Sequence, residues 1–327
     1  MEFFLESGLD LTLALQNAGD WIVSVMKGFT FLGTEDFYIV FLVLVWAFDY
    51  SLSMRLGVML MLTTALNSFF KMAFHQPRPY WSDSKVLDLG GPELGFGVPS
   101  GHSQTPVSLF GLFATTLKEK WMKIAVWVVI FFIDISRMIL GVHYYLDVLV
   151  GWTIGLIILW LFMKFEPNIK EYFSKKQIGT KILLVFLVSI VLLSINFGIR
   201  AINGDFTLDP TWIANAASAH PEEMLDPFSM DGSITTAATL FGLSVGYFWI
   251  SSIGTYQVKK NLGVNFLVFI IGLIGVLAIK QGLGAVFPGE DNLAGYFFRY
   301  LRYTIIGFWI MGLGPWLLVK LKLAKLD

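Results

Sequence analysis

Apolar runs long enough to cross a lipid bilayer recur along most of this 327-residue chain. A helix needs about 20 residues to span the hydrocarbon core. Runs of this kind lie at 35–50, 56–74, 103–118, 122–140, 144–164, 182–198, 233–253, 264–287 and 298–320. Inside lipid, a helix satisfies all of its own backbone polar groups. The sequence therefore predicts an all-α, polytopic helical membrane protein with about nine or ten spans.

The composition supports this class and excludes others. Hydrophobic residues make up 56% of the chain and charged residues 14%, whereas soluble domains carry about 25% charged residues. The net charge of −1 offers no general attraction for nucleic acid, so no nucleic-acid partner is expected. The chain has no cysteine, which excludes disulfides, thiolate metal sites and a cysteine nucleophile.

Basic residues mark alternate connections between the apolar runs. They are Arg55, Lys118, Lys120, Lys123, Lys164, Lys170, Lys175, Lys176, Lys181, Lys259, Lys260, Lys320, Lys322 and Lys325. By the positive-inside rule these connections face the cytoplasm. The loops 75–102, 140–144, 199–232 and 288–297 then face the periplasm or the exterior. We expect a multi-pass protein of a bacterial plasma (inner) membrane.

The N-terminal region differs from the apolar runs. Polar residues interrupt residues 9–32, which favours an amphipathic helix in the membrane interface, with a short or tilted span as the alternative. Glu2 and Glu6 stand where a secretory signal would be basic, so no cleavable signal peptide is expected.

Cations gather at the outer ends of several predicted spans. Lys71 and Arg78 close one span, and Arg137 lies near the end of another. Two guanidinium groups and an ammonium suit a group with three anionic oxygens. Ser100 and the amide of Gly101, at a predicted helix N-terminus, add hydrogen bonds for the same anion. The topology brings these groups to one membrane face, which predicts a phosphate-binding cage.

Two histidines complete the predicted site. Asp147 lies four residues after His143, so on a helix its carboxylate can hold one ring nitrogen protonated and leave the other free as a nucleophile. His102 comes from another helix and can protonate a leaving oxygen. No carboxylate cluster suggests a divalent cation, so neither a metal nor a cofactor is expected. His75 and His220 stand outside this pattern and are interpreted as interfacial residues.

These residues form three ordered motifs. KxxxxxxRP stands as Lys71, Arg78 and Pro79, PSGH as residues 99–102, and SRxxxxxHxxxD as Ser136, Arg137, His143 and Asp147. The sequence thereby resembles the type 2 phosphatidic acid phosphatase superfamily of lipid phosphate phosphatases. The resemblance implies a helix-bundle core, metal-independent dephosphorylation and attack by His143, supported by Asp147 and by a proton from His102. It also implies phosphate binding by Lys71, Arg78, Ser100, Gly101 and Arg137.

The resemblance covers residues 1–165, the predicted catalytic membrane core. Residues 166–327 match no motif and are interpreted as an accessory transmembrane region, in which residues 232–242 faintly resemble residues 101–111. For Lys280 and Arg302, pairing with a carboxylate such as Glu290 or Asp291 is favoured over contact with a substrate headgroup or sugar.

The sequence thus predicts a phosphatase for a membrane lipid phosphate or diphosphate, with its site open to the outer leaflet. Isoprenyl diphosphate, phosphatidylglycerol phosphate, phosphatidic acid and lipid A phosphate all remain candidates, because the cage recognises only phosphate. The expected partners are this lipid substrate and the bilayer. Two alternatives stay open: phosphotransfer from the histidine to a lipid or sugar hydroxyl, and transport of a lipid or anion by the additional helices.

Overall fold

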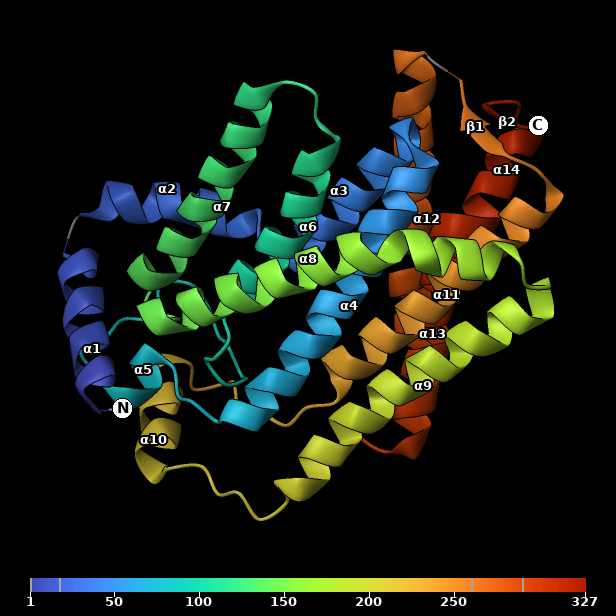
Figure 1. Cartoon of the computed structure of the whole chain (residues 1–327). Helices are drawn as coiled ribbons and strands as arrows, with labels where there is room; N and C mark the ends of the chain where they lie inside the picture. Colours follow the sequence, from blue (N-terminus) through green and yellow to red (C-terminus); the bar gives the residue numbers. More distant parts are fainter. Residues whose placement is uncertain (1, 18, 260, 290) are drawn as a thin grey trace. The chain divides into compact units, whose positions relative to one another are not determined.

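The computed structural model describes residues 2–17, 19–259, 261–289 and 291–327, and most of them belong to helices (Figure 1). The helices of the first half are α1 (Glu2–Gln16), α2 (Asp20–Phe31), α3 (Glu35–Phe48), α4 (Tyr50–Phe74), α5 (Pro79–Ser82), α6 (Gly101–Thr116), α7 (Lys120–Ile139) and α8 (Tyr145–Ser174). Those of the second half are α9 (Ile178–Ile202), α10 (Pro210–Ala219), α11 (Asp231–Ile253), α12 (Leu262–Val286), α13 (Leu293–Phe308) and α14 (Gly314–Lys320). A π-helical segment, η1 (Trp309–Leu313), joins α13 to α14, and strands β1 (Tyr256–Val258) and β2 (Ala324–Leu326) pair antiparallel. The predicted all-α class is confirmed.

Six described helical segments are long and apolar enough to cross a membrane. They are Tyr50–Ser82, Tyr145–Ser174, Ile178–Ile202, Asp231–Ile253, Leu262–Val286 and Leu293–Lys320. Helices α2 and α3 qualify only as a pair bent by 51°, which gives up to seven spans, fewer than the nine or ten predicted. The predicted runs 103–118 and 122–140 are helical, but α6 has only 16 residues and α7 carries several charges. The protein is a polytopic helical membrane protein.

The N-terminal region forms two helices, so the prediction of one amphipathic helix over residues 9–32 is wrong. The chain turns at Gly19, where φ is +107°. Glycine adopts such a conformation readily because it has no Cβ. Helix α2 therefore starts in a new direction at Asp20.

The chain folds into two compact units, and each takes segments from both halves of the sequence. The first unit contains Met1–Phe37, Leu66–Leu161 and Phe197–Ser229, and the second contains Tyr38–Ala65, Phe162–Asn196 and Met230–Asp327. The packing therefore does not divide at residue 166. A functional division between a catalytic core (1–165) and an accessory region (166–327) stays a prediction.

Close helix packing fixes the centre of the first unit. A Cβ atom at Gly151 would lie 2.9 Å from the carbonyl oxygen of Ser100, and one at Gly155 would lie 2.7 Å from that of Gln104. Real Cβ atoms do not approach backbone so closely, so only glycine lets the start of α8 lie against the start of α6. This contact joins the segment that carries His102 to the segment that carries Asp147.

Residues 197–229 form a cover on the loop between α5 and α6. Within this cover, the side-chain amide of Asn215 donates to the carbonyl of Trp81 at 2.9 Å, and helix α10 lies beside α5 (Figure 1). The amide of Asp226 donates to the carbonyl of Leu94 at 3.2 Å. A buried apolar cluster fills this region and comprises Tyr80, Trp81, Val86, Phe96, Leu140, Val142 and Ala216.

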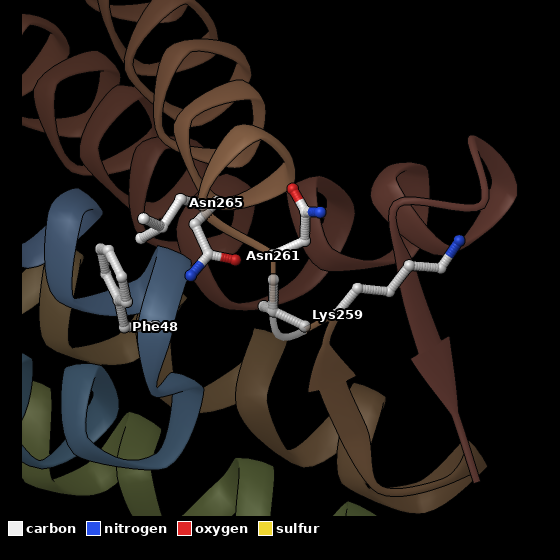
Figure 2. A pocket seen from close by; sticks show the side chains of 6 residues that line it. Phe48, Lys259, Asn261 and Asn265 are labelled. Atoms are coloured by element: carbon white, nitrogen blue, oxygen red, sulfur yellow. The ribbon is translucent and has the colours of Figure 1, made fainter.

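The second unit is dominated by tight contact between α11, α13 and η1. A Cβ atom at Gly246 would lie 2.7 Å from the backbone of Gly312, and one at Gly307 would lie 2.6 Å from the carbonyl of Thr239. The Tyr50 hydroxyl donates to the carbonyl of Met311 at 2.6 Å. A pocket of about 280 Å³ in this unit is lined by Phe48, Val258, Lys259, Asn261, Leu262 and Asn265 (Figure 2).

Lys280 and Arg302, the two cations for which carboxylate partners were predicted, both belong to the second unit. The Arg302 guanidinium lies 5.0 Å from the centre of the Tyr303 ring, a cation–π contact. Glu290, one suggested carboxylate partner, lies outside the described residues. Pairing of Lys280 or Arg302 with Asp291 stays a prediction.

Candidate active site

The first unit contains all eight residues of the predicted site. Lys71 lies in the last turn of α4, and Arg78 directly precedes α5. Ser100 caps α6, whose first residues are Gly101 and His102. Arg137 lies in the last turn of α7, His143 in the following turn, and Asp147 in the first turn of α8.

The His143 ring lies between the carboxylate of Asp147 and the guanidinium of Arg78. Its Nδ1 is 3.1 Å from Oδ2 of Asp147, and its Nε2 is 3.1 Å from Nη1 of Arg78. Since the guanidinium can only donate, Nε2 accepts, and Nδ1 then carries the proton towards the carboxylate. The amide of Tyr144 also donates to Asp147 Oδ2 at 2.9 Å and fixes that carboxylate. The predicted pairing of His143 with Asp147 is present.

The electrostatics of the site keep His143 uncharged. Its side chain is only 1% exposed. Burial, reinforced by the positive charges of Arg78 and Lys71, lowers the pKa of His143 well below its ordinary value. A neutral imidazole with an unprotonated Nε2 has the form that a nucleophile requires.

Backbone carbonyls hold the cations of the cage. Lys71 donates to the carbonyl of Phe96 at 2.5 Å. Arg78 donates through Nε to the carbonyl of Gly95 at 2.7 Å and through Nη1 to that of Val142 at 3.0 Å. Both arrangements fix the direction of a long side chain before any substrate arrives, so the cage is preorganised for an anion.

Arg137 is oriented by a helix that the motifs do not include. Its Nη1 donates to the Thr30 hydroxyl of α2 at 2.6 Å. The side chain is only 3% exposed. A buried guanidinium with fixed partners presents its remaining N–H groups in a constant geometry, which suits phosphate binding.

The PSGH segment adds two polar atoms that the described residues leave without a hydrogen-bond partner. They are the hydroxyl oxygen of Ser100 and Nε2 of His102, and both are buried. Such atoms are rare in folded proteins, where a buried polar group usually has a partner. The amide of Asn67 supports the segment, because it donates to the carbonyl of Pro99 at 3.2 Å and to Gln104 at 2.9 Å.

Two glycines that sequence reasoning did not select leave space for His102 and Asp147 of the predicted site. A Cβ atom at Gly33 would lie 2.6 Å from Cδ2 of His102, and one at Gly97 would lie 3.1 Å from Oδ2 of Asp147. The sequence offers no signal for Gly33, which is distant from every motif along the chain. Gly97 belongs to the glycine-rich stretch before PSGH, and its role follows only from the fold.

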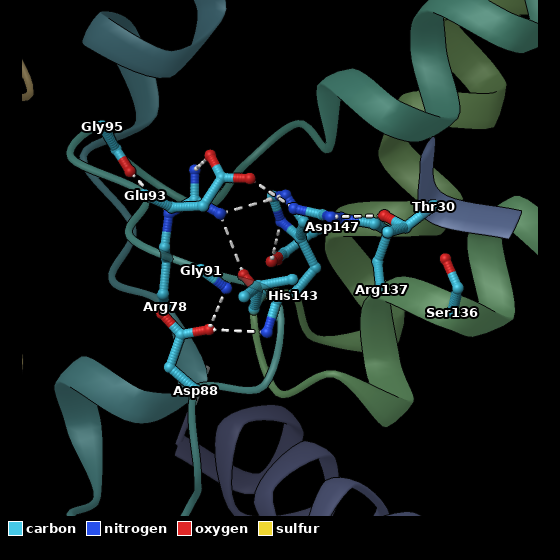
Figure 3. A network of polar contacts seen from close by, with 12 residues as sticks. Thr30, Arg78, Asp88, Gly91, Glu93, Gly95, Ser136, Arg137, His143 and Asp147 are labelled. Carbon is cyan, nitrogen blue, oxygen red and sulfur yellow. Dashed lines mark hydrogen bonds and ion pairs between the residues drawn. The ribbon is translucent and has the colours of Figure 1, made fainter. Parts of the chain in front are cut away.

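Glu93 is the most important residue that sequence reasoning missed. Its Oε2 accepts from Nη2 of Arg78 at 3.0 Å, and its Oε1 accepts from Nη2 of Arg137 (Figure 3). Burial alone would raise the pKa of Glu93, but the charges of Arg78 and Arg137 outweigh it and lower the pKa well below its usual range. The cage therefore holds an ionised carboxylate. Its only signal in the sequence is a lone acid in the glycine-rich loop.

The side chains of the two histidines that are not motif residues contact residues that do not belong to the predicted site. His220 pairs with Asp88 at 2.7 Å, and His75 stacks on Phe206 with ring centres 4.6 Å apart. Among the described residues, no three His, Cys, Asp or Glu side chains gather as a metal site would require. That the reaction needs no metal stays a prediction.

Comparison with known families gives two matches that together cover most of the chain. Residues 52–171 match the PAP2 superfamily, and residues 234–326 match the transmembrane extension of PAP2 superfamily phosphatases. The first match includes all three motifs. The second lies within the region that the sequence alone left without a relative.

Curated proteins with similar sequences are phosphatases. Glucose-6-phosphatase 3 of Bos taurus is 26% identical over 352 residues, covering 97% of this chain and 96% of its own length. The Homo sapiens protein of the same name is 25% identical, covering 97% of this chain and 95% of its own length. Phosphatidylglycerophosphatase B of Bacillus subtilis (strain 168) is 28% identical over 169 residues, covering 47% of this chain and 80% of its own.

No solved structure matches the chain. The first family match contains the three motifs, which meet in the structure around the buried His143, and the second match covers most of the C-terminal region. Together these findings identify the chain as a membrane phosphatase of the PAP2 superfamily that carries the superfamily's transmembrane extension.

Proposed function

We propose that the protein hydrolyses phosphate monoesters through a phosphohistidine on Nε2 of His143. One observation carries this proposal. Nε2 of His143 lies 3.1 Å from the guanidinium of Arg78, while Nδ1 of the same ring lies 3.1 Å from Asp147. A phosphoryl group bound to Arg78 therefore meets the lone pair of an oriented imidazole.

The proposed first step transfers the phosphoryl group to the enzyme. Nε2 of His143 forms a bond to phosphorus, and the bond from phosphorus to the ester oxygen breaks. His102 gives its proton to that oxygen, which leaves as an alcohol. Asp147 stabilises the positive charge on the His143 ring, and Lys71, Arg78 and Arg137 stabilise the phosphoryl oxygens.

The proposed second step restores the enzyme. His102, now neutral, removes a proton from water while the water oxygen bonds to phosphorus. The bond between phosphorus and Nε2 breaks, and the electron pair returns to His143. Inorganic phosphate leaves, with Ser100 and the amide of Gly101 as further donors to its oxygens. Ester and water are consumed, and alcohol and phosphate are produced.

A membrane lipid phosphate or diphosphate is the leading substrate class. The site belongs to a polytopic membrane protein, and phosphatidylglycerophosphatase B of Bacillus subtilis is a relative over 47% of this chain. The basic connections favour a site on the outer face of a bacterial plasma membrane. Residues 1–165 hold every motif residue and are proposed as the catalytic core, with 166–327 as the accessory region.

A hexose phosphate is the second candidate. The similarity to glucose-6-phosphatase 3 of Bos taurus extends over 97% of this chain and includes the transmembrane extension. A cage that contacts only the phosphoryl group accepts the phosphate of a soluble sugar as well as that of a lipid.

Phosphate release in detergent with excess chelator tests the proposal and ranks the two classes. The panel consists of phosphatidylglycerol phosphate, phosphatidic acid, an isoprenyl diphosphate and glucose 6-phosphate. We expect the wild type to release phosphate from at least one of them and His143→Ala to release none. Full activity of His143→Ala, or release that needs a divalent cation, would contradict the mechanism. Turnover only with an added acceptor alcohol would instead support phosphotransfer.

A further inference from the structure

A carboxylate of the protein already occupies the arginine side of the phosphate cage. Glu93 bridges two guanidinium groups, with Oε2 at 3.0 Å from Arg78 and Oε1 accepting from Arg137 (Figure 3). The Arg78 and Arg137 side chains are 1% and 3% exposed, whereas that of Glu93 is 29% exposed. The Glu93 side chain is therefore more accessible than either arginine that it bridges.

These bonds are the ones that a phosphoryl group needs. Two anionic oxygens on two guanidinium groups reproduce part of the hydrogen bonding that arginine offers to phosphate. Arg78 uses Nη2 for Glu93 and Nη1 for His143, so the same guanidinium connects the carboxylate to the nucleophile. We propose that Glu93 is an internal competitor for the substrate phosphate and must leave both arginines before a phosphoryl group reaches His143.

The arginines do not depend on Glu93 for their orientation. Arg78 keeps its bonds to the carbonyls of Gly95 and Val142, and Arg137 keeps its bond to Thr30. A residue needed only to position the arginines would be redundant beside these partners. Competition with the substrate accounts for the bridging carboxylate, because it places a negative group where negative substrate oxygens bind.

The Glu93 side chain can leave without movement of its loop. Its backbone is held separately, because the Tyr80 hydroxyl donates to the Glu93 carbonyl at 3.1 Å. The next residue is also anchored, since the carbonyl of Leu94 accepts from the amide of Asp226 in the cover. Release of the carboxylate therefore needs only rotation about side-chain bonds once its two ion pairs open.

The competitor makes the cage selective for strongly charged ligands. A singly charged carboxylate yields to a phosphate dianion, which offers more negative charge to the same cations, but resists singly charged anions. A carboxylate that occupies the cage in about 90% of molecules lowers apparent affinity for phosphate about tenfold. The same exchange helps product phosphate to leave, because Glu93 returns to the arginines.

Substitution of Glu93 in the full-length protein tests this inference, which rests on the cage being the proposed phosphate site. Glu93→Gln removes the charge and keeps the shape, and Glu93→Ala removes the side chain. We expect both variants to bind inorganic phosphate at least about tenfold more tightly by calorimetry in detergent. KM for the hydrolysed substrate should fall by a similar factor, while kcat stays equal or falls because phosphate leaves more slowly.

Asp83→Asn is the matched control. It removes one negative charge from the same loop, where the Asp83 carboxylate accepts from the nearby amide of Lys85 at 2.8 Å. It should leave phosphate affinity, KM and kcat unchanged. Glu93→Asp is a further check, because a side chain one methylene shorter keeps the charge but cannot reach both arginines. Its phosphate affinity should lie between those of the wild type and Glu93→Gln.

Phosphate binding to Glu93→Gln and Glu93→Ala that is equal to or weaker than the wild type would overturn the inference. No phosphate binding by any variant would overturn it too, because the cage would then not be a phosphate site. Calorimetry needs no turnover, so it separates this inference from the proposed function. A wild type that binds phosphate but hydrolyses nothing would contradict only the proposed function.

Discussion

The two compact units use buried groups in opposite ways. The first unit buries Arg78, Arg137, His143 and Asp147 almost completely. Backbone carbonyls accept from Arg78, Thr30 and Glu93 accept from Arg137, and His143 pairs with Asp147. The second unit buries an apolar cluster around Trp46, Leu243 and Met311, and its helices meet through glycines. Buried charge is costly unless it is paired, so a unit that keeps so much of it does so for chemistry. The comparison separates the residues proposed to act on phosphate from residues that hold helices together.

Asp147→Asn should have the largest effect and should change only activity. The amide cannot hold the Nδ1 proton of His143 as a carboxylate does, and it cannot stabilise the charged ring. We expect kcat to fall by on the order of 10²–10⁴, as when the orienting acid of a histidine is neutralised. Phosphate release measures kcat, and thermal unfolding in detergent checks that the variant is folded. A loss smaller than about tenfold would show that Asp147 does not support His143.

Gly246→Val in the second unit is the counterpart of Asp147→Asn in the first, and it should change stability but not activity. A Cβ atom there would lie 2.7 Å from the backbone of Gly312, so the helices must move apart. Such overpacking costs about 1–3 kcal/mol. The melting temperature should fall, while kcat of the molecules that remain folded should not change. Gly28→Ala is the control, because a Cβ at Gly28 meets no neighbour within 4 Å. A lower kcat at full stability would break the separation between the units.

The pH profile of kcat/KM should reflect the charge around His143. Burial and the charges of Arg78 and Lys71 lower its pKa, so the ring stays neutral at pH values where an ordinary histidine is protonated. Protonation removes the nucleophile, so activity is kept above the lowered pKa and is lost as the pH falls through it. We expect the acid limb of kcat/KM to lie below pH ~6.5 and to fall up to about tenfold per pH unit. An acid limb with an apparent pKa of about 7 or higher would contradict this assignment.

His220→Ala should have the smallest effect. It removes the partner of Asp88, whose side chain is buried and also accepts from the amides of Gly90 and Gly91. Loss of one such hydrogen bond costs about 1 kcal/mol, so we expect KM to rise by about fivefold or less. Limited proteolysis should cut the loop 83–97 faster. Glu222→Ala, at an exposed position beside it, should change neither quantity. Unchanged proteolysis of His220→Ala would show that the pair does not hold the cover.

Much of the site was predictable because its signals are local in sequence. His143 and Asp147 are four residues apart in the sequence, and each cation of the cage lies near the end of an apolar run. Glu93, Thr30 and Gly33 were not predictable in this way. Each acts through a contact between distant segments, such as Thr30 on α2 with Arg137 on α7. The pattern of apolar residues along the sequence does not indicate such a contact, because the contact exists only once the helices have packed.

The fold, like the site, could be predicted from the sequence only where its signals are local. Apolar runs predicted helices correctly, since hydrophobic length is a property of one segment. They did not predict that Phe197–Ser229 joins the first unit, because this depends on polar contacts of its loop, such as those of Asn215 and Asp226. The number of spans was overestimated for a similar reason. An apolar run of 16 residues, as in α6, packs inside a protein as readily as it inserts into lipid.

The most direct test of the account is to trap the phosphorylated enzyme. Purified protein is mixed with a ³²P-labelled substrate that it hydrolyses, quenched in alkali within milliseconds, and digested for mass spectrometry. The account predicts an alkali-stable, acid-labile phosphate on the peptide that contains His143, and none in His143→Ala. Label on another residue, or turnover without any labelled protein in the wild type, would contradict a phosphohistidine at His143.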